Sequence, residues 1–357
     1  MIHTLSPSGR RSLLRQRSRT NTTCNSNKIY LVCLGFIIIY AFITVILKLF
    51  TFTNVIDENG TTFVNDRGNL RGGAVQVSDY AVFDEGGVAS AATHLIVVAG
   101  HSVTLPALPT SATDRVSSKN YFEKEEAWIL EPYQKGQGLP QAILGHISAG
   151  IELARQDEDS LLLFSGGETR PKIGPISEGS SYFRVADALN LWDKEEDLTV
   201  HNPGHSSART RTTIEDYATD SFENLLFSIC RFYEVTGSYP TKITMVSFSF
   251  KEARFRNLHA PALLWPDSAF EYVGVDPPSS TGFNLQDASN GESMNSVKPF
   301  EGDPYGCSSP ILQEKRHRRN PFKRRAPYEM TCPQMRELLN WCGPSIFSGN
   351  LPWKLSW

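Results

Sequence analysis

Short apolar runs recur along the second part of the chain, and each ends in glycine or in polar residues. The first run covers residues 94–99 (HLIVVA) and is followed by Gly100 and His101. Similar runs occupy residues 161–165, 198–201, 243–248 and 270–275. Uninterrupted apolar runs of this length are typical of strands that are buried on both faces, as in a parallel sheet.

Helical patterns separate these runs. Apolar side chains recur at helical spacing over residues 141–156, 182–190 and 216–234. Strands that alternate with helices form βαβ units, which build a parallel sheet. The sequence therefore predicts an α/β domain of Rossmann-like type over residues 93–280, with a mostly parallel sheet and helices on both of its faces.

The first 50 residues follow a different pattern. Residues 1–28 contain six Lys or Arg and no acidic residue, and residues 29–47 contain no charged residue. A helix of that length matches a hydrocarbon core of about 30 Å. A cleaved signal peptide would have a shorter apolar stretch and a small-residue cleavage site, and a mitochondrial presequence would be amphipathic. We therefore expect a transmembrane signal anchor at residues 29–50.

The charges around the anchor predict its orientation. Basic residues precede it, whereas Asp57 and Glu58 follow it, and positive charge stays on the cytosolic side. The sequence therefore predicts a single-pass type II membrane protein of the secretory pathway, in the endoplasmic reticulum or Golgi, with residues 1–28 in the cytosol. Residues 51–92 read as a linker to a lumenal domain, because they are rich in Gly, Ser, Asn and Asp.

Residues 281–357 are expected to form a C-terminal extension. Its basic segment, residues 315–325 (KRHRRNPFKRR), is interpreted as a solvated loop that could also bind acidic lipids or glycans. The cysteines that follow the anchor are Cys230, Cys307, Cys332 and Cys342. In an oxidising lumen the last three are the expected disulfide partners, and their pairing stays open.

The charge composition of the chain restricts the kinds of molecule that it can bind. The chain has 35 Lys and Arg against 38 Asp and Glu, a formal net charge of −3, whereas nucleic-acid binding depends on basic residues that neutralise phosphates. We therefore expect no nucleic-acid partner. The expected partners are a membrane and a small anionic molecule, and the sequence identifies no cofactor and no protein partner.

The turn after residues 161–165 is a candidate anion site, because ligands of parallel sheets bind beyond the carboxyl ends of the strands. Ser165 is followed by Gly166 and Gly167, and adjacent glycines let backbone N–H groups point at an anion. Thr169 and Arg170 add a hydroxyl and a cation. Neither a P-loop nor a dinucleotide-binding glycine pattern is present, and an ordinary tight turn is the alternative.

Further candidates follow other runs. Lys251 and Arg254 come three residues apart after residues 243–248, where a helix N-terminus would also favour an anion. His101 and His205 also follow apolar runs. Histidine titrates near neutral pH, so both are candidates for acid–base work or ligand contact.

We expect no metal site. His201 and His205 have the spacing of a helical metal pair, but residues 202–204 (NPG) prevent a helix there. The triplet Asp157, Glu158 and Asp159 resembles the metal-binding triplet of many Golgi glycosyltransferases, yet it precedes an apolar run instead of following one. An acidic loop at a helix end is the simpler interpretation.

The order of the motifs resembles a known family. The motifs are residues 99–101 (AGH), residues 164–167 (FSGG), Ser177-Glu178 before a helix, the set Glu215, Ser221 and Asn224, and residues 246–254 (VSFSFKEAR). Together they are similar to the YdcF/SanA/ElyC-like family, a domain of unknown function numbered 218. Trp128, Phe250 and residues 303–307 (DPYGC) are more similar to its eukaryotic, largely fungal branch.

The resemblance implies a Rossmann-like fold with a polar pocket, in membrane-anchored proteins tied to cell-surface biogenesis. It supports the choice of Glu178, Glu215 and Asn224 as candidate site residues. The chain departs from the bacterial pattern at Lys251, which stands where bacterial members carry His, whereas Arg254 is retained.

These observations combine into one hypothesis, a lumenal enzyme of cell-surface or glycolipid metabolism, a transferase or hydrolase, that binds a phosphate-bearing or nucleotide-like molecule. A Golgi-type glycosyltransferase and a non-enzymatic scaffold or carrier are the alternatives. The candidate catalytic residues are His101, Glu178 and Glu215. The candidate ligand-binding residues are Ser165, Gly166, Gly167, Thr169, Arg170, His205, Ser221, Asn224, Lys251 and Arg254.

Overall fold

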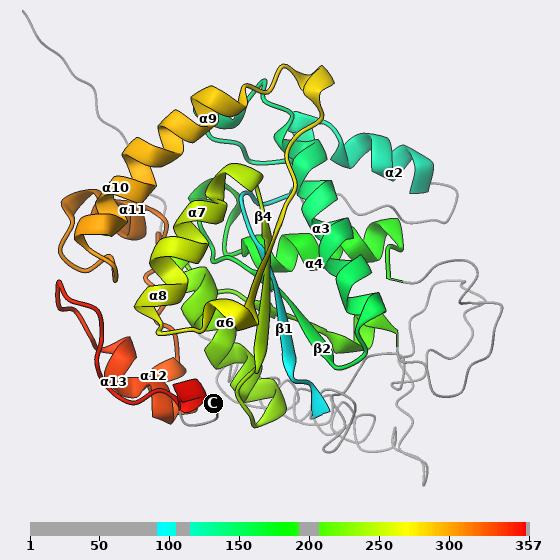
Figure 1. The fold of residues 1–357 in the computed structure, drawn as a ribbon. Helices are drawn as coiled ribbons and strands as arrows, with labels where there is room; N and C mark the ends of the chain where they lie inside the picture. Colours follow the sequence, from blue (N-terminus) through cyan, green and yellow to red (C-terminus); the bar gives the residue numbers. More distant parts are fainter. Residues whose placement is uncertain (1–90, 105–114, 193–206, 355–357) are drawn as a thin grey trace, which may run out of the picture. The chain divides into compact units, whose positions relative to one another are not determined.

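A five-stranded parallel sheet forms the centre of the protein in the computed structural model, which describes residues 91–104, 115–192 and 207–354 (Figure 1). The strands are β1 (His94–Ala99), β2 (Ser160–Ser165), β3 (Thr212–Glu215), β4 (Lys242–Ser247) and β5 (Phe270–Gly274). They lie in the order β3-β2-β1-β4-β5, and each neighbouring pair is parallel. The predicted α/β fold is confirmed, and the switch in strand order falls between β1 and β4.

Helices follow the strands along the chain. Those of the sheet region are α2 (Arg115–Phe122), α3 (Leu139–Gln156), α4 (Glu178–Leu189), α6 (Ser221–Thr236), α7 (Glu252–Arg254) and α8 (Ala260–Ala262). A π-helical turn, Phe255–His259, joins α7 to α8. The later helices are α9 (Leu285–Glu292), α10 (Lys298–Gly302), α11 (Pro310–Arg318), α12 (Tyr328–Thr331) and α13 (Arg336–Leu339).

Both faces of the sheet are covered, as the apolar runs predicted. Leu95 and Val97 of β1 belong to a core cluster that includes apolar residues of α6. Ile96 and Val98 point to the opposite face, into a second cluster that includes residues of α3 and α4. All four side chains are fully buried. This alternation explains why β1 carries no polar residue between Leu95 and Val98.

One strand and the starts of two helices differ from the sequence prediction. Helix α4, predicted over residues 182–190, begins earlier, at Glu178. Residues 212–215 (TTIE) form the edge strand β3, which was not predicted because the run is short and half polar. The helix predicted from residue 216 begins only at Ser221, because the Asp220 carboxylate caps it by accepting the Glu223 N–H at 2.9 Å. The strand predicted at residues 198–201 lies outside the described residues.

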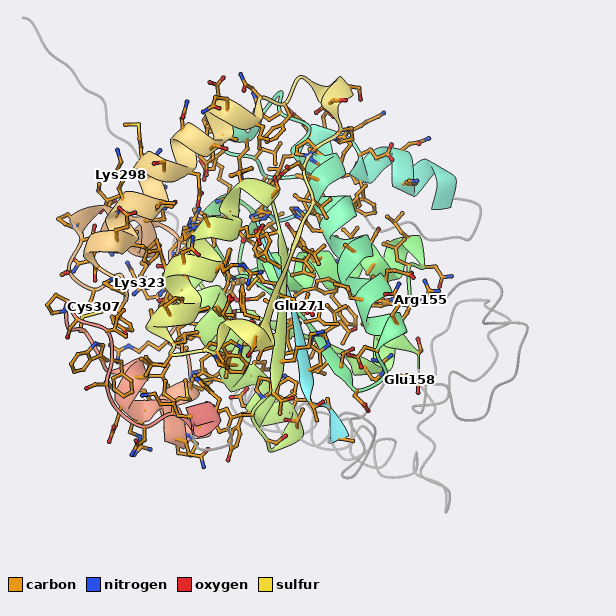
Figure 2. The ribbon with its side chains drawn as sticks, in the orientation of Figure 1. Arg155, Glu158, Glu271, Lys298, Cys307 and Lys323 are labelled. Atoms are coloured by element: carbon orange, nitrogen blue, oxygen red, sulfur yellow. A yellow bond between two sulfur atoms is a disulfide. The ribbon has the colours of Figure 1, made fainter. Side chains whose placement is uncertain are left out.

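The C-terminal extension completes the core on the α6 face of the sheet. Phe300, Tyr305, Tyr328 and Trp353 are buried in the same cluster as the inner side chains of α6. A disulfide joins Cys307, which is labelled in Figure 2, to Cys342. The extension is therefore part of the same hydrophobic core as the sheet.

The cysteine prediction was only partly right. Two of the three expected partners, Cys307 and Cys342, form a disulfide. Cys332 is instead a free, buried thiol, as is Cys230. The Tyr239 hydroxyl lies 3.4 Å from Sγ of Cys332.

The basic segment is not the solvated loop that its composition indicated. Its first residues, Lys315 to Arg318, form the last turn of α11. Within the described ranges, no helix is long and apolar enough to cross a membrane. The anchor predicted at residues 29–50 lies outside those ranges, as do residues 51–90 of the linker predicted at residues 51–92.

Helix α4 packs so closely on the sheet that only glycine fits at one position. A Cβ atom added to Gly179 would lie 2.5 Å from the carbonyl oxygen of Phe164 and 3.0 Å from that of Glu215. We expect Gly179→Ala to lower the free energy of unfolding by about 2 kcal/mol, since backbone atoms of two strands must move. Denaturant unfolding measures this change.

A second helical glycine provides the matched control. Nothing lies within 4 Å of a Cβ atom added to Gly291 in α9, so Gly291→Ala should leave stability unchanged or raise it by up to about 1 kcal/mol. Equal effects of the two substitutions would show that α4 does not pack as described.

Candidate functional site

A cavity of about 1120 Å³ lies at the carboxyl ends of the strands. Residues that directly follow β1 and β4 line it, including His101 and Lys251, and so do residues that follow β2 and β3, including Thr169 and Ser221. This is the position at which open parallel sheets bind ligands. The cavity is therefore the candidate site, and each predicted residue can be placed relative to it.

The Ser-Gly-Gly turn does not present its N–H groups to a ligand, which contradicts the sequence prediction. The Gly166 N–H donates to the Glu215 carbonyl at 2.9 Å, and the Gly167 N–H donates to the Ala218 carbonyl at 2.8 Å. Neither glycine lines the cavity. A Cβ atom on Gly166 would lie 2.8 Å from Cβ of Glu178, so this glycine makes room for α4.

Glu178 and Thr169 do face the cavity. Ser177 caps α4 by accepting the Ser180 N–H at 2.9 Å, which makes Glu178 the first residue of the helix. The Thr169 hydroxyl donates to Oε1 of Glu178 at 2.5 Å. Both residues line the cavity. The close approach of α4 thus brings a carboxylate to the carboxyl end of the sheet.

Arg170 supports the site from outside the cavity. It is buried and forms an ion pair with Glu131 at 3.1 Å. Its guanidinium also donates to the carbonyl of Ile129 at 3.0 Å and to that of His101 at 3.3 Å. Arg170 does not line the cavity, because its donors bond to the loop that follows β1.

Glu215 lies behind the cavity and does not line it. Its carboxylate accepts the Ser165 hydroxyl at 2.8 Å, the Tyr217 N–H at 2.7 Å and the Tyr328 hydroxyl at 3.2 Å. Burial raises the pKa of Glu215 to about 7. The predicted catalytic role does not fit a fully buried group that joins β2, β3 and the extension.

Asn224 and Ser221 of α6 reach the cavity. The Asn224 amide donates to Oγ of Ser165 at 2.8 Å and to the Ser165 carbonyl at 3.0 Å. Oγ of Ser221 lies 2.8 Å from Nε2 of His259, a fully buried residue that sequence analysis did not identify. His259 had no local sequence signal, since it lies inside a helical segment.

His101 lines the cavity as predicted. Its Nε2 lies 3.1 Å from Oγ of Ser247, and its Nδ1 lies 3.4 Å from Nζ of Lys251. Burial, together with the charge of Lys251, lowers the pKa of His101 well below its usual value. His101 is therefore uncharged at neutral pH and is better suited to position Lys251 than to carry a proton.

Lys251 and Arg254 both line the cavity. The turn that follows β4, Ser249–Lys251, directs Lys251 over the rings of Phe248 and Phe250. Burial and the charge of Arg254 lower the pKa of Lys251 to about 7. Arg254 is buried beside Glu292 of α9, with Nε 2.7 Å from Oε1.

Three further cations, Lys315, Arg318 and Arg319, line the cavity from the end of α11 and the residue that follows it. Sequence analysis placed them in the basic segment at residues 315–325, which it interpreted as a solvated loop. Arg318 is exposed, whereas Lys315 and Arg319 are half-buried. Burial and the charge of Arg319 lower the pKa of Lys315 to about 8, and Arg319 donates to the Thr219 carbonyl at 3.2 Å. Lys315 and Arg319 are four residues apart, which places them on the same side of a helix. This spacing is the feature of the sequence that could have identified them as a pair. We call Lys251, Arg254, Lys315 and Arg319 the cationic wall.

The acidic triplet lies away from the cavity. It connects the end of α3 to the start of β2, where Asp157 contacts His94 at 2.7 Å and the Asp159 carbonyl accepts the Thr93 N–H at 2.9 Å. Figure 2 labels Glu158 of the triplet. This is the amino edge of the parallel sheet, opposite to the cavity. His205 lies outside the described residues.

The fold and site together define an α/β protein with a parallel sheet and a polar cavity at its carboxyl edge, one wall of which carries several cations. The chain is 32% identical over 264 residues to the Saccharomyces cerevisiae protein named Uncharacterized protein YOR238W, a match that covers 66% of this chain and 86% of the yeast protein. The chain belongs to the family of that protein. No family model matches the chain, and no solved structure does.

The raised pKa of Glu215 predicts how stability depends on pH. Between about pH 4.5 and 7 the folded state keeps a proton that the unfolded state has lost, so this contribution is complete below pH 4.5 and disappears as pH rises through 7. The free energy of unfolding should fall by as much as about 3 kcal/mol over this range relative to Glu215→Gln.

Denaturant unfolding across the pH range measures the difference between wild type and Glu215→Gln. Glu301→Gln, which changes an exposed carboxylate of α10, should follow the wild-type profile. Parallel profiles for wild type and Glu215→Gln would mean that Glu215 does not hold a proton in the folded state.

Proposed function

We propose that the protein is a YdcF-like α/β enzyme, a transferase or hydrolase, whose cavity binds a small molecule that carries a phosphate. The cationic wall is the observation that carries this proposal. Lys251 and Arg254 come from the segment after β4, whereas Lys315 and Arg319 come from α11, and all four line one cavity. Convergence of basic groups from two distant segments is what recognition of a phosphate requires.

The surroundings of the wall support a bound anion. The pKa of Lys251 and that of Lys315 are lowered first by burial and then by neighbouring cations, so like charges in the cationic wall repel one another. Within the cavity lining, Glu292 forms an ion pair with only one wall residue, Arg254. A phosphate would relieve this repulsion and accept hydrogen bonds from several cations at once.

The chemistry of the cavity favours group transfer or hydrolysis. The Glu178 carboxylate and the Lys251 amine both line it, and a base and an acid near a bound phosphate are the groups that such reactions use. We assign proton transfer to these two residues and a positioning role to His101. Ser221 and Asn224 of α6 are available to bind the remainder of the ligand.

The disulfide supports the secretory pathway as the location. Cys307 and Cys342 are bonded, and structural disulfides persist in oxidising compartments. A signal anchor at residues 29–50 would place the cavity in the lumen, where cell-surface or glycolipid metabolism takes place. The glycosyltransferase alternative has no support from the acidic triplet, which lies at the opposite edge of the sheet.

Arg319 provides the clearest test, because Arg254 is buried in an ion pair and its loss would also destabilise the fold. With inorganic pyrophosphate as the probe, Arg319→Ala should weaken binding at least about tenfold, the loss expected for one charge-assisted contact. Isothermal titration calorimetry on the full chain measures the affinity.

Arg256→Ala is the matched control for this substitution. Arg256 is a partly exposed residue that pairs with Asp267 at 2.9 Å, and it does not line the cavity. Its loss should change pyrophosphate affinity less than twofold. Wild-type protein that binds no pyrophosphate, or equal losses in the two variants, would overturn the proposal.

The lowered lysine pKa values predict how anion binding depends on pH. Inorganic sulfate keeps its charge across the neutral range, whereas Lys251 and Lys315 lose their protons through about pH 7 and 8. Sulfate affinity should therefore fall about tenfold between about pH 6 and 9. In the double variant Lys251→Arg and Lys315→Arg both positions stay charged, and the affinity should vary little. An equally steep fall in that variant would show that other groups titrate.

A further inference from the structure

Lys251 has an environment that separates it from the other cations of the wall. Its Nζ lies 5.0 Å from the ring centroid of Phe248 and 5.8 Å from that of Phe250. Nδ1 of His101 is 3.4 Å from the same Nζ. No carboxylate in the described part of the chain forms an ion pair with Lys251. Lysine side chains placed against apolar groups beside other cations are those that react as nucleophiles.

The neighbouring charges keep the amine available. Burial and the positive charges of Arg254 and Arg319 lower the pKa of Lys251 to about 7. Near neutral pH, about half of the molecules therefore carry an uncharged Lys251 amine with a free electron pair. The His101 imidazole beside it is uncharged as well, because burial lowers its pKa.

We propose that Lys251 is a catalytic residue that forms an imine with the aldehyde or ketone group of a phosphate-bearing ligand. This inference rests on the proposed function, because Arg254, Lys315 and Arg319 are the groups that would hold the phosphate while the carbonyl lies near Lys251. The cationic wall indicates that the ligand carries a phosphate. The Lys251 amine indicates that the same ligand carries an aldehyde or ketone group.

The reaction balances without a further reactant. The electron pair of Nζ attacks the carbonyl carbon, a C–N bond forms, and the electrons of the C=O double bond move to oxygen. The nitrogen then loses its two protons, and both end on that oxygen. An electron pair of the nitrogen forms the second C–N bond as the C–O bond breaks, and water leaves. His101, whose Nδ1 lies 3.4 Å from Nζ, positions the amine for this attack.

Pyridoxal 5′-phosphate, an aldehyde that carries a phosphate, is a suitable probe for the full chain. At about pH 7 it should give the absorbance of an imine, and reduction with borohydride should fix the label on Lys251, which peptide mass spectrometry identifies. Inorganic pyrophosphate should slow the labelling at least about tenfold, as should use of pyridoxal without the phosphate.

Two variants sharpen the test. Lys251→Arg keeps the charge but cannot form an imine, so this variant should show no rapid labelling at residue 251. Lys172→Arg, which changes a surface lysine outside the cavity, should still be labelled rapidly at Lys251. The peptide map of the wild-type chain does not depend on how either variant folds.

The outcomes separate this inference from the proposed function. If the wild-type chain binds pyrophosphate while the label spreads over exposed lysines without preference for Lys251, the imine is excluded and the phosphate site stands. Labelling of Lys251 that neither pyrophosphate nor removal of the probe's phosphate slows would overturn the ligand class. Absence of both pyrophosphate binding and Lys251 labelling would overturn both proposals.

Discussion

The buried carboxylate of Glu215 joins three segments at the carboxyl edge of the sheet. It stands at the end of β3 and accepts hydrogen bonds from Ser165 at the end of β2 and from Tyr328 of the extension. A buried acceptor without donors costs several kcal/mol, so these three segments are held together at the carboxyl edge of the sheet. With the extension fixed against α6 in this way, α11 brings Lys315 and Arg319 to the cavity.

The cations that line the cavity repel one another, and this repulsion destabilises the folded protein. Four basic side chains share one wall, where burial in the first place and neighbouring charges in the second lower the pKa of Lys251 and that of Lys315. Proteins tolerate such repulsion mainly at functional sites, where a ligand relieves it. Burial and this repulsion distinguish Lys251 from an ordinary surface lysine, because together they keep the amine partly uncharged. One arrangement of charge therefore supports both phosphate binding and amine chemistry.

The fold was largely predictable from the pattern of apolar residues, and the site only in part. The strands at residues 94–99, 160–165 and 242–247 are long apolar runs, whereas the short, half-polar β3 was missed. The rule that ligands bind at carboxyl ends pointed to His101 and Lys251, and the family resemblance pointed to Glu178; all three line the cavity. The rule also pointed to Gly166 and Arg170, and the resemblance to Glu215, but the polar groups of these three residues bond to other parts of the protein. A residue type does not show which partner its polar group has.

The α/β architecture and the edge of the sheet at which the cavity lies follow from local sequence, because a buried parallel strand needs a continuous apolar run and the residues after that run lie at its carboxyl end. Which cations meet at that edge depends on contacts between distant segments. Lys251 and Lys315 are separated by more than sixty residues, and no local pattern relates them. They share a cavity because the extension buries Phe300, Tyr328 and Trp353 in the same core as α6, and hydrophobic burial of this kind depends on the whole fold.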